Sequence, residues 1–149
     1  SLYFNHLFPM GVASMCEAVD LVREGTAPRI EQDPSGGTYE GWCRAEDVKI
    51  DWHQPVDSVY NMIRGANPQP GAWTTLTGQK LTVLDSTRVE VIDATPGTVI
   101  SVDETGMTIA ADGGSILISR VKTESGAKLS AADFLGQLTV SVGDVLGAS

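Results

Sequence analysis

The amino-acid sequence predicts an α+β chain in which two helices and a long connector precede a small antiparallel β-barrel. Three observations support this prediction. An apolar stripe with helical spacing occupies residues 10–24, periodicity is absent from residues 26–50, and short segments of alternating apolar and polar residues follow Pro70. Sixteen glycines in 149 residues indicate many turns, and frequent turns are typical of short strands.

The first region, residues 1–25, is predicted to be helical. Pro9 suits the first turn of a helix and Gly25 suits its end. The apolar face between them consists of Val12, Met15, Cys16, Val19 and Val22. Residues 2–8 are apolar nearly all round, and we expect Pro9 to separate them as the last turns of another helix. Because such apolar elements need a packing partner, we expect this region to be the remnant of a larger, truncated domain.

Residues 26–50 are predicted to form an extended connector, because prolines and glycines punctuate a polar stretch without periodicity. Residues 51–70 are predicted to contain a junction helix. Pro55 suits the first turn of that helix, and Pro68 and Pro70 prevent its continuation. Its apolar stripe consists of Val56, Val59, Tyr60 and Ile63.

Residues 71–149 are predicted to form the barrel. Strands are expected at residues 72–76, 80–91, 97–102, 106–111 and 115–121, which are separated by glycine-containing turns. Five strands in about fifty residues are dense enough for a small barrel. Ser130 and Asp133 have the spacing of a capping-box variant, which predicts a short helix over 130–135.

The acidic charge of the chain argues against a nucleic-acid partner. The formal net charge is −9, and acidic residues are spread evenly along the sequence. Proteins that bind a phosphate backbone need clustered Lys and Arg, whereas the longest basic feature here is Arg120 with Lys122. Only Phe134 is an aromatic residue in the body of the predicted barrel, so a base-stacking platform is not expected there.

No motif for catalysis or metal binding is present in the sequence. Phosphate loops, nucleophile elbows and zinc-binding histidine motifs are all missing. Cys16 and Cys43 are too few to hold a metal alone, and we expect reduced thiols in a cytoplasmic protein. No apolar run approaches the ~20 residues of a membrane-spanning helix, so no membrane partner is expected.

Four residues near the predicted junction are candidates for a structural or interface role. Asp51 could accept hydrogen bonds from the free N–H groups at the start of the junction helix. Trp52 could pin the connector to the barrel, or could stack on a ligand. Arg64 favours the helix dipole, or could reach a partner domain. Trp73 is expected in the core or at an interface rather than as a binding platform.

The same region resembles the junction of the folate-dependent formyltransferases. The residues that carry the resemblance are Ile50-Asp51-Trp52, Val59-Tyr60-Asn61-Met62-Ile63-Arg64-Gly65 and Pro68-Gln69-Pro70-Gly71-Ala72-Trp73. Residues 25–29 and 37–41 are similar to the connector of that family. Residues 2–9 are most similar to the hydrolase region of its 10-formyltetrahydrofolate dehydrogenase branch. The resemblance is specific over residues 1–90 and architectural beyond them.

The resemblance implies that residues 1–25 end a Rossmann-like catalytic domain and that residues 71–149 form a barrel like the oligonucleotide-binding (OB) fold. It also implies that the parent enzyme uses 10-formyltetrahydrofolate in one-carbon metabolism. The catalytic Asn, His and Asp of the family would lie before Ser1, so no catalytic residue is carried over and His6 does not match. The chain would bind no cofactor itself, and its partner would be its own missing catalytic domain.

Several alternatives remain open from the sequence. The chain is also similar to the tRNA-binding C-terminal domain of methionyl-tRNA formyltransferases, although three basic residues face five acidic ones in residues 26–50. An amino-sugar formyltransferase, a nucleic-acid-binding barrel and an interaction module with an unrelated partner are further alternatives. The formyl acceptor, the oligomeric state and a following aldehyde dehydrogenase domain are left open.

Overall fold

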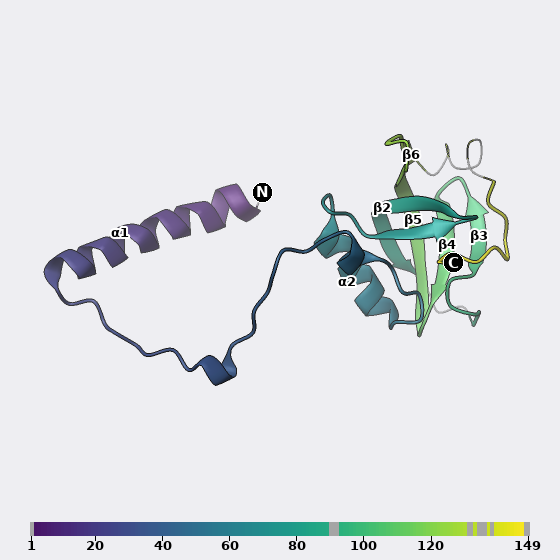
Figure 1. Ribbon diagram of the computed structural model, residues 1–149. Coiled ribbons are helices and arrows are strands. Elements are labelled where there is room, and N and C mark those ends of the chain that lie inside the picture. Colours follow the sequence, from purple (N-terminus) through teal and green to yellow (C-terminus); the bar gives the residue numbers. More distant parts are fainter. Residues whose placement is uncertain (1, 90–92, 131–132, 134–136, 138, 148–149) are drawn as a thin grey trace. The chain divides into compact units, whose positions relative to one another are not determined.

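The computed structural model describes residues 2–89, 93–130, 133, 137 and 139–147 (Figure 1). The chain divides into two compact units, Ser1–Glu40 and Gly41–Ser149, each considered by itself. Within the described residues, no helix is both long enough and apolar enough to cross a bilayer.

The first unit contains one continuous helical segment. A π-helical turn, η1 (Tyr3–Leu7), runs directly into α1 (Phe8–Glu24). The expectation that Pro9 separates two helices is therefore wrong. The N–H of Phe8 donates to the carbonyl of Tyr3, five residues earlier, so the turn before Pro9 is wider than an α-helical turn. In a regular α-helix the ring of Pro9 would clash with the carbonyl four residues before it.

The helix α1 ends at the predicted glycine, and its predicted apolar face is exposed. Gly25 adopts a left-handed φ of 70°, and its N–H donates to carbonyls of the last turn, as predicted for the helix end. The side chains of Val12, Met15, Val19 and Val22 all remain exposed within the described structure. The chain then continues through a short 3-10 turn, η2 (Pro34–Gly36).

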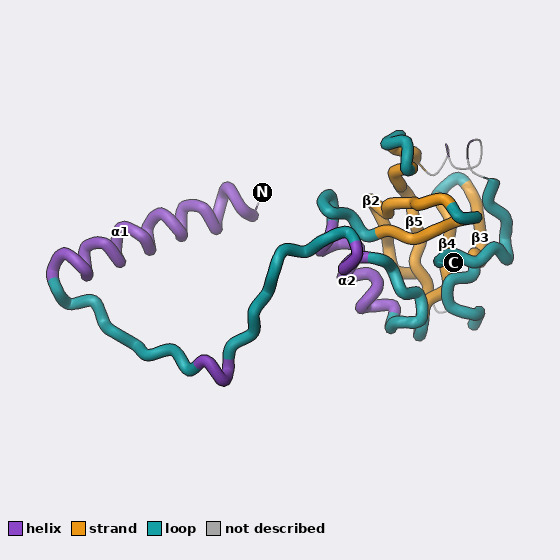
Figure 2. The backbone as a smooth tube through the Cα atoms, viewed as in Figure 1, coloured by secondary structure: helices purple, strands orange, loops and turns teal. Residues whose placement is uncertain are grey.

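The second unit is built on one antiparallel sheet of six strands (Figure 2). The strand order is β1-β2-β5-β4-β3, and β6 pairs with β5. The strands are β1 (Trp73–Leu76), β2 (Gln79–Val89), β3 (Val99–Asp103), β4 (Gly106–Ala111), β5 (Gly114–Thr123) and β6 (Lys128–Ser130). The five predicted strands are confirmed, except that residues 90–91 of the second lie outside the described residues.

The C-terminal segment 143–147 joins the two edges of the sheet. Val99 donates to the carbonyl of Asp144 over 2.8 Å, and Leu146 donates to that of Gly97 over 2.8 Å, beside β3. Gly147 donates to the carbonyl of Thr75 on β1 over 2.9 Å. The segment therefore satisfies backbone groups at both edge strands of the sheet.

The core of the second unit lies between the sheet and α2 (Val56–Ala66), which packs against β2 and β5. Val59 and Ile63 of α2 are buried there, as the predicted apolar stripe requires. Val48 and Ile50 are buried in the same core, next to the short turn η3 (Glu46–Val48). The last residues of the expected connector therefore pack with the sheet.

The predicted helix over 130–135 lies mostly outside the described residues. Of its proposed capping box, Ser130 donates through both its N–H and its hydroxyl to the Asp133 carboxylate, over 3.1 and 2.7 Å. These bonds lower the pKa of Asp133, with the side-chain bond as the larger cause.

Candidate functional site: a tryptophan clamp at the junction

Residues 45–52 run along the edge strand β1 and attach to it through the backbone. The N–H of Ile50 donates to the carbonyl of Trp73 over 2.8 Å, and Lys49 forms a parallel bridge with Trp73. Two tryptophans reinforce this attachment: one extends from residues 45–52 to β1, and the other extends from β1 to residues 45–52.

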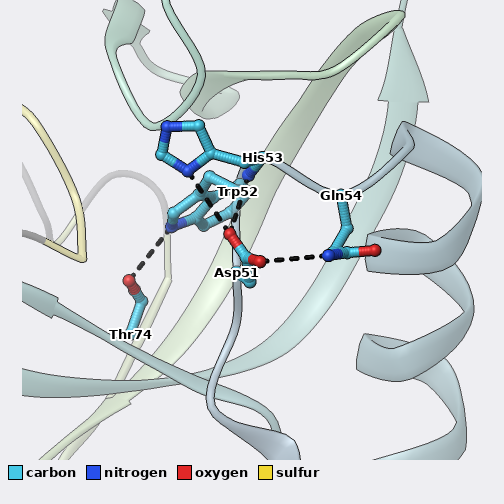
Figure 3. A network of polar contacts seen from close by, with 5 residues as sticks. All are labelled: Asp51, Trp52, His53, Gln54 and Thr74. Atoms are coloured by element: carbon cyan, nitrogen blue, oxygen red, sulfur yellow. Dashed lines mark hydrogen bonds and ion pairs between the residues drawn. The ribbon is translucent and has the colours of Figure 1, made fainter.

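Trp52 reaches from the segment towards β1. Its side chain is 3% exposed, and its indole N–H donates to the Thr74 hydroxyl over 3.1 Å (Figure 3). A Cβ added at Gly147 would lie 3.4 Å from indole Cδ1, and one at Gly97 would lie 3.7 Å from the Trp52 Cβ. The indole is therefore packed under the C-terminal segment, and this burial fits a structural role better than ligand stacking.

Trp73 reaches in the reverse direction, from β1 to the segment. Its indole N–H donates to the carbonyl of Ala45 over 2.6 Å. The ring is half-buried, with the Lys80 ammonium 4.3 Å and the Lys49 ammonium 5.7 Å from its centroid. We call the pair of bonds Trp52–Thr74 and Trp73–Ala45 the tryptophan clamp.

Asp51 does not cap α2, contrary to the expectation from the sequence. The residue before the helix is Pro55, and no side chain caps the first turn. The N–H of Val56 instead donates to the carbonyl of Asp112 over 2.8 Å. Asp51 lies too far before the helix, because the intervening residues form a turn of their own.

The Asp51 carboxylate organises that turn. It accepts a hydrogen bond from the side-chain amide of Gln54 over 3.1 Å and another from the backbone N–H of His53 over 3.0 Å (Figure 3). The Nδ1 atom of His53 lies 3.3 Å from the same carboxylate. The amide of Gln54, followed by the His53 N–H, lowers the pKa of Asp51 below its ordinary 3.8. An exposed carboxylate with a lowered pKa is a weak proton acceptor at neutral pH, so Asp51 itself is poorly suited to act as a general base.

Arg64 lies apart from the clamp, in the last turn of α2. Its guanidinium is 5.3 Å from the centroid of the Tyr60 ring. Arg88 of β2 approaches the same ring at 5.3 Å and pairs with Asp57 of α2. The structure thus brings Asp51, Trp52 and Trp73 together and leaves Arg64 on an exposed part of α2.

Sequence reasoning missed the partners of the clamp. Thr74 and the carbonyl of Ala45 accept the two indole N–H groups, and Gln54 and His53 complete the turn at Asp51. In the sequence, a threonine that directly follows a tryptophan in a strand is only a weak indication of a hydrogen-bond partner, and a backbone carbonyl gives no indication at all. Their roles follow from the register of residues 45–52 against β1.

The surface beside the clamp does not fit a folate. A depression of about 180 Å³ is bordered by Trp52, His53, Pro96 and Leu146. Small-molecule sites have roughly 300–1,000 Å³ and a few converging polar groups, whereas the buried indole N–H and threonine hydroxyl here already bond to each other. Among the residues that the structure describes, no group of three metal-ligating side chains occurs.

The described second unit thus consists of an antiparallel sheet, one packed helix and a junction fastened by two tryptophans. The sequence profile of the family "Formyl transferase, C-terminal domain" matches residues 43–138, which is more than half of the chain. The chain belongs to this family.

Relatives of known name include two kinds of enzyme. The cytosolic 10-formyltetrahydrofolate dehydrogenase of Mus musculus is 49% identical over 87 residues, which is 58% of this chain and 10% of the relative. The corresponding protein of Xenopus tropicalis is 35% identical over 90% of this chain and 16% of its own length. The methionyl-tRNA formyltransferase of Bacillus velezensis is 37% identical over 92% of this chain and 44% of its own length.

Among solved structures, HypX from Aquifex aeolicus in complex with tetrahydrofolic acid has the same fold. The TM-score is 0.64 at 22% identity, over 95% of this chain and 25% of that chain. The chain thus spans between a tenth and less than half of the length of these relatives.

Proposed function

We propose that this chain is the C-terminal portion of a 10-formyltetrahydrofolate-dependent enzyme of one-carbon metabolism. In this proposal the enzyme is of the 10-formyltetrahydrofolate dehydrogenase kind, and it transfers or hydrolyses the formyl group in the cytoplasm. The chemistry takes place in a catalytic domain of the same polypeptide, outside residues 1–149. The chain supports that domain and contributes no catalytic residue.

The observation that carries this proposal is the apolar face of α1. Large apolar side chains along it are exposed, and they border a shallow groove of about 400 Å³. The groove is lined by Tyr3, Leu7, Phe8, Gly11, Val12, Met15 and Cys16. Exposed contiguous apolar surface of this kind marks an interface, and the catalytic domain of the same chain is the partner that the family membership favours.

The test compares the complete polypeptide with residues 1–149. Loss of the formyl group from 10-formyltetrahydrofolate is followed through the absorbance of the folate. We expect turnover by the complete polypeptide and none by residues 1–149. Turnover by residues 1–149, or none by the complete polypeptide, would contradict the proposal.

A variant pair tests the role of α1 in the complete polypeptide. Val12→Asp places a charge on the apolar face and is expected to reduce turnover or soluble yield. Glu17→Lys changes an exposed side chain of the same helix and is the matched control, expected to leave both unchanged. Equal effects of the two substitutions would argue against a buried α1 interface.

A methionyl-tRNA formyltransferase is the second candidate. It is favoured by the 37% identity to the Bacillus velezensis enzyme over 92% of this chain. Formylation of methionyl-tRNA by the complete polypeptide, in preference to hydrolysis of the folate, would select this candidate over the first.

A further inference from the structure

The register of the sheet gathers lysines that are scattered in the sequence. Trp73 of β1 pairs with Thr82 of β2, Thr82 pairs with Lys122 of β5, and Lys122 pairs with Lys128 of β6. These four residues form one row across four strands, on the face of the sheet opposite their buried strand neighbours Leu81, Val121 and Leu129. Thr82 within the row is itself buried, so side chains on either side of it form the accessible part of the row.

Two more lysines extend this row at the tryptophan. Lys80 and Lys49 lie 4.3 and 5.7 Å from the centroid of the Trp73 ring. We call Lys49, Lys80, Lys122 and Lys128 the lysine stripe. The clustering goes beyond the pair Arg120 and Lys122 that the sequence suggested as the longest basic feature, because four of the ten basic residues belong to the stripe.

The lysine stripe lacks acidic partners. Within the described part of the chain, none of its four ammonium groups forms an ion pair, although the sequence has 19 acidic residues. Lys122 and Lys128 are direct cross-strand neighbours, an arrangement of like charges that destabilises a sheet. The pairing of Lys122 with Lys128 therefore lowers the stability of the sheet, and an external anion would relieve this repulsion.

We propose that the lysine stripe binds a short, extended acidic segment of a polypeptide. The row crosses three strand spacings, which is about 14 Å. An extended peptide of about four or five residues has the same length, and its carboxylates would match ammonium groups acting as point charges.

A nucleic acid is the less suitable occupant. The indole N–H of Trp73 is bonded to Ala45 and lysines lie over its ring, so the ring is not free to stack on a base. Acidic groups limit the stripe: Asp85 stands opposite Arg120 in the register, and Glu124 lies in the turn between β5 and β6. A long polyanion would extend beyond the stripe over a chain with net charge −9.

The experiment measures the binding of fluorescein-labelled oligoglutamate to residues 1–149 by fluorescence anisotropy. An oligoglutamine of equal length and a single-stranded RNA of similar contour length are the comparison probes. We expect the oligoglutamate to bind at low ionic strength and to weaken towards ~0.15 M salt, where charges are screened beyond about 8 Å. The oligoglutamine is expected not to bind.

Matched variants locate the binding surface. Lys122→Gln with Lys128→Gln removes two charges of the stripe and is expected to weaken oligoglutamate binding by about tenfold. Arg23→Gln with Arg29→Gln removes two exposed charges from the first unit and is expected to leave binding unchanged. No binding of oligoglutamate, equal losses in both double variants, or tighter binding of the RNA would overturn the proposal.

Discussion

Replacement of Trp52 by alanine tests the structural role of the clamp. The indole is 3% exposed, and replacing a buried aromatic residue by alanine costs about 3–5 kcal/mol. The change also removes the donor to the hydroxyl of Thr74, which is fully buried. We therefore expect a loss of about 4 kcal/mol, a large part of the ~5–15 kcal/mol by which domains are usually stable.

The assay is urea unfolding of residues 1–149, followed by far-ultraviolet circular dichroism because the number of tryptophans changes. With a urea dependence of about 2 kcal/mol per molar, the midpoint should fall by about 2 M. Trp52→Phe retains much of the packing without the N–H and should lose about half as much free energy.

Trp42→Ala is the control for the Trp52 variants, because Trp42 is 93% exposed, and its midpoint should change little. An unchanged midpoint for Trp52→Ala would refute the reasoning and would favour a role of the indole in ligand contact.

Three further predictions concern other features of the second unit. Trp73→Phe removes the donor to the carbonyl of Ala45 and should lower the free energy of unfolding by about 1 kcal/mol, measured in the same urea assay. Gly106→Ala should prevent stable folding, because the φ of Gly106 is +144° and a Cβ there would overlap a carbonyl of β5. Gly65→Ala should instead stabilise the chain by up to about 1 kcal/mol in thermal unfolding, because Gly65 lies in the last turns of α2 with open space around it. Because the pKa of Asp51 is lowered, its stabilising contribution should be complete above the ordinary value of 3.8 and should be lost as the pH falls through the lower value of the native state. Urea midpoints measured from neutral pH to about pH 2 should therefore decline less in Asp51→Asn than in the unaltered chain. An equal decline in both would count against this role of Asp51.

Local patterns were sufficient to predict most of the secondary structure. The stripe of α2, the glycine at the end of α1 and the alternating strands each depend on a few neighbouring residues, and each was confirmed. The break at Pro9 was predicted wrongly, because a π-turn accommodates the proline and cannot be read from helical periodicity.

The features that the sequence did not reveal depend on pairing between distant residues. The burial of Ile50 and the bond from Trp73 to Ala45 follow from the placement of residues 45–52 along β1. Lys122 and Lys128 likewise meet only through the register of β5 with β6. Charge spacing along the chain contains no information on such pairs, so the even distribution of charge in sequence concealed the lysine stripe.

Hydrogen exchange at the Ile50 amide tests the central claim, that the clamp makes residues 45–52 part of the folded second unit. This amide donates to Trp73, just as the amide of Val83 donates to the carbonyl of Ala72 within the sheet. We predict that Ile50 exchanges about as slowly as Val83 in the unaltered chain, and that Trp52→Ala accelerates Ile50 more than Val83. Exchange of Ile50 in the unaltered chain as fast as that of Ile30, an exposed residue of the connector, would contradict the claim.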